Sequence, residues 1–145
     1  MDAFHHRLEV VDPGSGRVLD QIPDDVFAPW SLSQDRRIAV IAAEGNIENR
    51  PSDVLIWRLG APVSDIQRVP IGGDVDAIAT CGADAACVLI DRQLVRIRLS
   101  DATIERRLKL PPDSGQSSSG PARLVASPDG RAVAIEAAWR RPASP

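Results

Sequence analysis

The chain has 145 residues and a formal net charge of −3, and 43% of its residues are hydrophobic while 26% are charged. These proportions are typical of one globular domain and exclude a wholly disordered chain. The acidic balance and the 3% content of aromatic residues argue against a broad nucleic-acid-binding surface, and no apolar run is long enough to span a membrane.

Short apolar runs alternate with turn residues and predict a chain made almost entirely of β-strands. Twelve prolines and ten glycines separate the runs and leave few windows long enough for a helix. The first two expected strands, Leu8–Asp12 and Arg17–Pro23, flank the turn Pro13–Gly16. Further strands are expected at Arg37–Ala43, Asp53–Leu59, Cys87–Asp91, Leu94–Leu99, Ile104–Leu110, Arg123–Ser127 and Arg131–Ala137.

One window fits a helix as well as a pair of strands. Leu94, Ile97, Ile104 and Leu108 recur at the spacing of one helix face. From residue 95 to residue 99, however, apolar side chains alternate with arginines, as they do in a half-buried strand. Because the neighbouring segments are all strand-like, two strands are favoured here.

The sequence repeats itself with a period near 47 residues. Ser31–Val40 and Val125–Ala134 both read as a small polar residue, a turn, an arginine and then an apolar strand, and Ser33 lies 94 residues before Ser127. Thr80, halfway between them, also precedes a turn and an apolar strand. The chain therefore divides into strands C and D, two complete sets A to D, and strands A and B. Four strands in a period of about forty to fifty residues are typical of β-propeller blades.

Three short motifs resemble those of known propeller families. Ala126–Arg131 resembles the A–B turn of WD-repeat and related bacterial propellers, and Asp53–Leu59 resembles the WD-repeat strand C, with Trp57 at the tryptophan position. Asp12–Val18 resembles the C–D turn of YVTN-type and quinoprotein-like blades. The frequent Ala, Arg, Val and Asp fit a GC-rich bacterial source. The chain departs from the WD-repeat pattern in that no Gly-His dipeptide precedes a blade and Arg58 follows the tryptophan in place of an aspartate.

The resemblance implies an all-β fold of four-stranded antiparallel blades in a single partial propeller domain. The expected blade pieces are 1–27, 28–72, 73–111 and 121–138, with a polar loop at 111–121 and a tail at 139–145. These make about three blades, whereas closed rings usually have four to eight. A part of a larger propeller is favoured. Two chains that form a six-bladed ring, or another small all-β fold, are the alternatives.

A non-enzymatic protein-interaction scaffold is the favoured function. The only histidines are His5 and His6 at the N-terminus, so neither a histidine-based catalytic triad nor a metal or cofactor site is expected. Trp30 is the candidate interaction residue, because exposed tryptophans are common in binding hot spots. Trp57 is instead expected between neighbouring sheets.

The expected partner is a protein, and open blade edges add the prospect of self-association. The alternatives are a ligand-binding or sensor propeller of a bacterial envelope or signalling protein, and part of a quinoprotein-like enzyme.

Cys81 and Cys87 are the candidate disulfide, because they flank the expected A–B turn of the middle blade. A five-residue turn, or a three-residue turn closed by the pair 82–86, would place the two cysteines opposite each other at disulfide distance. A four-residue turn, as expected in the other blades, would pair Cys81 with Ala86. The sequence leaves the redox state of the two cysteines open.

The sequence shows no signal peptide. The chain as written is therefore expected in the cytoplasm, or outside it if a signal or membrane segment lies beyond these residues.

Overall fold

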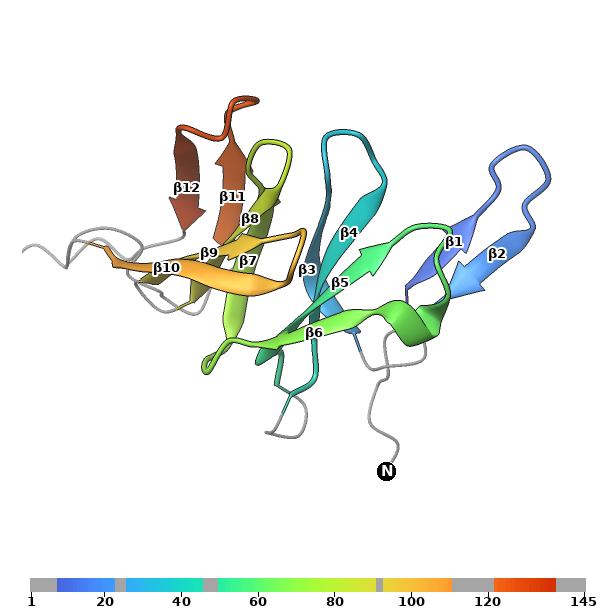
Figure 1. Ribbon diagram of the computed structural model, residues 1–145, viewed down its shortest axis with the longest axis horizontal. Helices are drawn as coiled ribbons and strands as arrows, with labels where there is room; N and C mark the ends of the chain where they lie inside the picture. Colours follow the sequence, from blue (N-terminus) through green and yellow to red (C-terminus); the bar gives the residue numbers. More distant parts are fainter. Residues whose placement is uncertain (1–7, 23–25, 46–49, 91–92, 111–121, 138–145) are drawn as a thin grey trace, which may run out of the picture.

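The computed structural model describes residues 8–22, 26–45, 50–90, 93–110 and 122–137 (Figure 1). These residues form twelve β-strands and one short 3-10 helix, η1. The elements are β1 (Glu9–Val11), β2 (Val18–Gln21), β3 (Val26–Leu32), β4 (Ile38–Ala43), β5 (Asp53–Arg58), η1 (Val63–Asp65), β6 (Gln67–Pro70), β7 (Val75–Thr80), β8 (Ala85–Ile90), β9 (Gln93–Arg98), β10 (Thr103–Lys109), β11 (Ala122–Ala126) and β12 (Val133–Ala137).

The strands form two complete blades between two half-blades. β3-β4-β5-β6 and β7-β8-β9-β10 are four-stranded antiparallel sheets in chain order, whereas β1-β2 and β11-β12 are two-stranded. This is the predicted order of strands C and D, two sets A to D, and strands A and B, and it confirms a partial propeller. The helical alternative for 94–108 is wrong, because these residues form β9 and β10. β3 begins at Val26, inside the expected piece 1–27.

Three apolar layers separate the four sheets, and each layer takes side chains from both of its neighbours. Strands β4, β5 and β8 are buried along nearly their whole length, because they carry apolar side chains on both faces. The first layer lies between β1-β2 and β3-β6, the second between the two complete blades, and the third between β7-β10 and β11-β12. The first contains Ile22, Val26, Ala39, Ile41, Ala43, Leu55 and Trp57. The second includes Val40, Ile56, Ile78, Val88 and Ile97, and the third includes Ala77, Ala79, Cys81, Cys87, Leu89 and Leu124.

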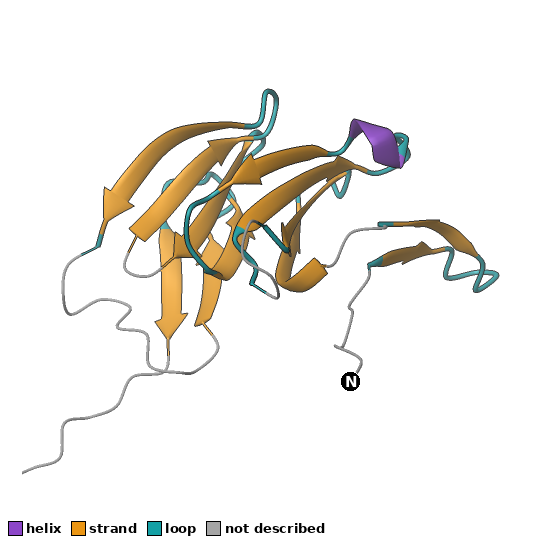
Figure 2. Cartoon of the chain, turned by 90° about the horizontal axis from the view of Figure 1, so that it is seen from below, coloured by secondary structure: helices purple, strands orange, loops and turns teal. Residues whose placement is uncertain are grey.

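Hydrogen bonds between the two complete blades add to the apolar contact of the second layer. The Thr80 hydroxyl donates to the Leu32 carbonyl at 2.8 Å, and the Arg107 guanidinium donates to the Ile71 carbonyl at 3.0 Å. Arg58, the residue that departs from the WD-repeat pattern, donates to the Leu99 carbonyl at 3.3 Å. In this chain, that arginine therefore joins one blade to the next. Figure 2 shows the successive sheets side by side, with the β1-β2 hairpin at one end.

Candidate binding surface at the A–B turns

The A–B turn of the first complete blade is closed by three hydrogen bonds that converge on Ser33 and Asp35. The Ser33 hydroxyl donates to Asp35 Oδ1 at 2.6 Å, and the Arg37 amide donates to the same oxygen at 3.0 Å. The Ile38 amide donates to Ser33 Oγ at 3.0 Å. The Ser33 hydroxyl and the Asp35 carboxylate thus find their partners within the turn, and these bonds fix the loop locally.

The A–B turn of the last blade has the same construction. In Ser127–Ala132 the three corresponding bonds measure 2.7, 3.0 and 3.0 Å. The fourth residue has a left-handed backbone in both turns, with φ at 60° for Arg36 and 72° for Gly130. The sequence repeat is therefore a repeat of turn geometry.

Both turns hold their aspartate in the charged form. A hydrogen bond from the serine hydroxyl is the largest cause that lowers the pKa of Asp35, and the Arg37 amide is the next. The pKa of Asp129 is lowered in the same way by Ser127 and the Arg131 amide. Each turn consequently presents a fixed carboxylate at the surface at neutral pH.

The A–B turn of the middle blade has three residues, one of the lengths that the sequence left open, but in a different register from the one expected. The Cys81 amide donates to the Ala85 carbonyl at 2.7 Å, so only residues 82–84 form the turn. Cys87 lies opposite Ala79, and Ala86 lies opposite Thr80. Neither predicted pairing, Cys81 with Ala86 or Cys81 with Cys87, is correct. The two cysteines are instead diagonal neighbours on the sheet face of the third layer.

Both cysteines are free thiols and are buried, with exposed fractions of 1% for Cys81 and 3% for Cys87. Their mutual side-chain hydrogen bond lowers the pKa of Cys81 and raises that of Cys87, because the Cys87 thiol donates to the Cys81 sulfur. Burial adds to the rise at Cys87. A disulfide between them stays a prediction for an oxidising environment.

A shallow depression of about 220 Å³ lies between the first two A–B turns, lined by Gln34, Asp35 and Ala83. Its volume is below the roughly 300 Å³ at which small-molecule sites begin, so it suits a single side chain of a protein partner better than a whole ligand. On the other side of the middle turn, the last turn packs closely against it. A Cβ at Gly130 would stand 3.0 Å from the carbonyl carbon of Cys81. We call residues 33–37, 82–84 and 127–131 the A–B turn surface.

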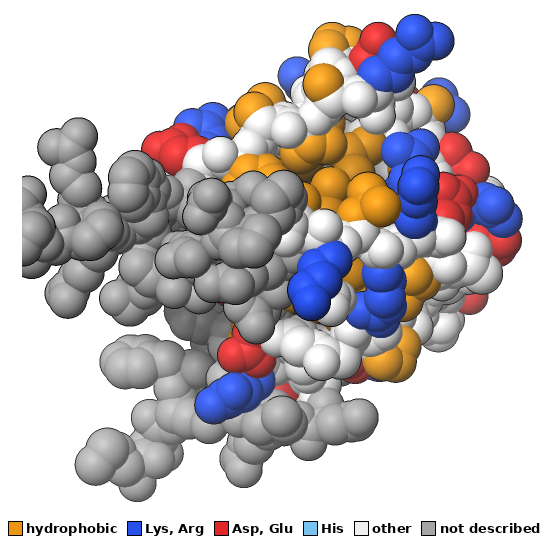
Figure 3. All heavy atoms as spheres, turned by 90° about the vertical axis from the view of Figure 1, so that its left-hand side faces the viewer, with side chains coloured by type: hydrophobic (Ala, Val, Ile, Leu, Met, Phe, Trp, Pro, Cys, Tyr) orange, Lys and Arg blue, Asp and Glu red, His pale blue; other side chains and the backbone are white. Residues whose placement is uncertain are grey.

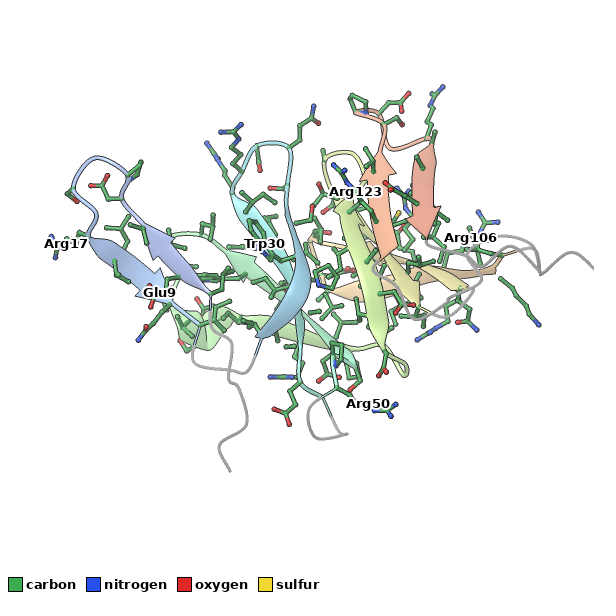
Figure 4. The ribbon with its side chains drawn as sticks, turned by 180° about the vertical axis from the view of Figure 1, so that it is seen from behind. Glu9, Arg17, Trp30, Arg50, Arg106 and Arg123 are labelled. Carbon is green, nitrogen blue, oxygen red and sulfur yellow. The ribbon has the colours of Figure 1, made fainter. Side chains whose placement is uncertain are left out.

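Trp30 and Trp57 lie in different environments although both are on the blade made of β3-β6. Trp57 is 1% exposed and packs in the first layer, as predicted. Trp30 is 49% exposed, and it lies opposite Ile41 in the register of β3 with β4 (Figure 4). Both tryptophans were candidates from the sequence, but the depression was not predicted. The sequence signal that points to the depression is the Ser-x-Asp motif repeated in the first and last A–B turns.

The described residues contain no cluster of three or more His, Cys, Asp or Glu that would hold a metal ion. His5 and His6 lie outside the described residues, as do the loop 111–121 and the tail 139–145. None of the described segments forms a helix with the length and hydropathy of a membrane span.

Comparisons with known proteins identify the fold. No protein-family model matches the sequence, and no curated protein does. The chain is similar to the β-propeller domain of Cps50 (Swd1) from Myceliophteria thermophila, with a TM-score of 0.62 and 10% identity over 89% of this chain and 43% of that one. It is also similar to the WD40 repeats of RRP9, with a TM-score of 0.57 and 15% identity over 83% and 36% of the two chains. The chain thus spans less than half the length of either, and it has a WD-repeat propeller-like fold.

Proposed function

We propose that this chain is a non-enzymatic scaffold that binds a segment of a partner protein on its A–B turn surface. The observation that carries the proposal is the depression between two turns, bordered by the carboxylate of Asp35. The depression is too small for a typical small-molecule ligand and lies on turns held rigid by their own hydrogen bonds. The likeness to WD40-type propellers supports the fold, and the site itself must support the function.

The chemistry of the depression favours a basic side chain from the partner. Asp35 is an anion at neutral pH, as an ordinary aspartate is, and Ser33 and the Arg37 amide lower its pKa further. A lysine or arginine that enters beside it would form a charge-assisted hydrogen bond. Gln34 supplies a neutral amide on the same rim, and the Ala83 methyl leaves room for an aliphatic stem.

A library of random displayed peptides tests this function. We expect the intact chain to enrich peptides that contain a basic residue. Ala83→Arg places bulk and like charge in the depression, so it should abolish the binding of these peptides. Ser64→Arg changes another exposed residue, on η1, so it is the matched control and should retain binding. Absence of enrichment, or peptides that bind the Ala83 variant equally well, would contradict the proposal.

A further inference from the structure

The large hydrophobic side chains that are exposed in the described residues concentrate at the two ends of the row of blades. At the N-terminal end they lie on the β1-β2 hairpin and on β3. At the C-terminal end they lie on β10 and β11. The side chains are Val11, Val18, Leu19, Trp30 and Leu32 at the first end, and Leu108 and Val125 at the second. Two apolar ends of one molecule are typical of surfaces that another chain covers.

The exposure of Trp30 follows from the half-blade beside it. Trp30 lies opposite Ile41, and Leu32 lies opposite Ala39, so both side chains project on the face of the first layer. Among the described residues, β1-β2 are the strands that cover that face, and they correspond to strands C and D. In the next blade the corresponding residue, Ile78, lies opposite Val88 and is only 6% exposed, because a complete blade packs on it. An A–B pair in front of β3 would bury Trp30 in the same way.

The first layer also contains a buried polar group that has no partner among the residues that the structure describes. The indole N–H of Trp57 is buried, and none of the described residues accepts a hydrogen bond from it. A buried donor without an acceptor is uncommon in a complete protein core.

The C-terminal end carries the other half of a blade. β11-β12 correspond to strands A and B, and they cover β7-β10 with Leu124, while Val125 points away and is 51% exposed. Leu108, opposite Leu94 on the outer part of the same blade, is 39% exposed, where strands C and D of a further blade would pack. Figure 3 shows apolar side chains gathered on this end, with basic side chains, Lys or Arg, beside them.

We propose that a second copy of this chain covers both ends and closes a ring of six blades. β11-β12 of one copy and β1-β2 of the other would form one four-stranded blade, with the free edge of β12 beside the free edge of β1. Its A strand would cover Trp30 and Leu32, and its C and D strands would cover Leu108. Because the same contact forms twice, the assembly closes with two-fold symmetry, and the edges of β12 and β1 are paired at both junctions. Six blades lie within the usual range of four to eight.

Sedimentation velocity on the whole chain across a range of concentrations tests the proposal. We expect a discrete dimer. Trp30→Arg at one end and Val125→Arg at the other should each weaken dimerisation by about a hundredfold, since each ring carries the buried charge twice. Both side chains are about half exposed in the single copy, so the fold should persist, which circular dichroism verifies. Ser64→Arg is the control and should still dimerise.

Mixing the two variants distinguishes this head-to-tail ring from other dimers. A ring with one Trp30→Arg copy and one Val125→Arg copy has one junction free of substitutions, and the other junction carries both. The mixture should therefore dimerise more strongly than either variant alone. A monomer at every concentration, a series of ever larger species, or variants that dimerise as the unmodified chain does would each overturn the proposal.

Discussion

Arg36 has a strained backbone conformation in a turn that is otherwise well hydrogen-bonded. It has a φ of 60° in the first A–B turn, where the last turn has Gly130 with a φ of 72°. An L side chain disfavours this left-handed conformation, whereas glycine adopts it readily. The chain retains an arginine at this position, so its turn geometry is imposed by Ser33 and Asp35 and not by the preference of the residue itself.

We expect Arg36→Gly to stabilise the protein by about 0.5–1 kcal/mol, since relief of backbone strain exceeds the added flexibility of the unfolded chain. The midpoint of urea unfolding measures the change. Gln34→Gly, in the same turn but without a positive φ, is the control and should be neutral or destabilising. A lower midpoint for the Arg36 variant would show that its side chain contributes more than its backbone costs.

At the scale of elements, Gly130 determines how the last half-blade packs on its neighbour. A Cβ at this position would stand 3.0 Å from both the Cys81 carbonyl carbon and the Gly82 nitrogen. Both atoms belong to backbone, so neither can move as the end of a flexible side chain would. The residue also has a φ of 72°, which an L side chain rarely adopts. Glycine is thus required here for two independent reasons.

Gly130→Ala should therefore destabilise the protein by about 1–3 kcal/mol, and the loss should concentrate in β11-β12. Hydrogen exchange by mass spectrometry measures it as faster exchange of residues 122–137 with little change in β3-β6. Gly16→Ala is the matched control, because Gly16 also has a positive φ of 73° but no atom lies near its Cβ. If both variants lose the same amount of stability, the close approach of residue 130 to Cys81 does not contribute to the destabilisation.

Nine of the twelve strands were predictable from the sequence because apolar alternation and turn residues act locally, whereas β3, β6 and β7 lie outside the apolar runs from which strands were inferred. Every strand position inferred from these runs holds a strand, and the order of half-blades and blades follows from the 47-residue repeat. The register at Cys81 was not predictable, since residue types alone did not distinguish a turn of three residues from one of four or five. Gly82, with a φ of 71°, closes the shorter turn.

The sequence predicted that Trp57 packs between sheets and that Trp30 is the exposed candidate, but it did not show which element leaves Trp30 uncovered. Trp30 and Trp57 are the same residue type in similar strands, yet one is 49% exposed and the other 1%. The difference arises because β1-β2 cover the outer part of the first layer and leave the inner part open. The depression beside Asp35 likewise exists only because the turns of two blades meet there.

At the scale of the whole molecule, stability is linked to pH through three turn aspartates whose pKa is lowered, two in A–B turns and one in a C–D turn. Hydrogen bonds from Ser33, Thr103 and Ser127 are the largest causes that lower the pKa of Asp35, Asp101 and Asp129 respectively. The unfolded chain lacks these bonds and keeps the ordinary carboxyl pKa. Above that value the stabilisation is fully present, and it disappears as the pH falls through the lower pKa values of the folded state.

We therefore expect the melting temperature to be level near neutral pH and to fall below about pH 4. The double variant Ser33→Ala, Ser127→Ala removes the main cause of the lowered pKa at two of the three turns, so its melting temperature should start lower and fall less between about pH 6 and about pH 3. Ser64→Ala leaves these turns intact and should follow the unmodified chain. Differential scanning calorimetry across this range provides the comparison. If the double variant loses as much stability in acid as the unmodified chain does, these turns do not control the acid response.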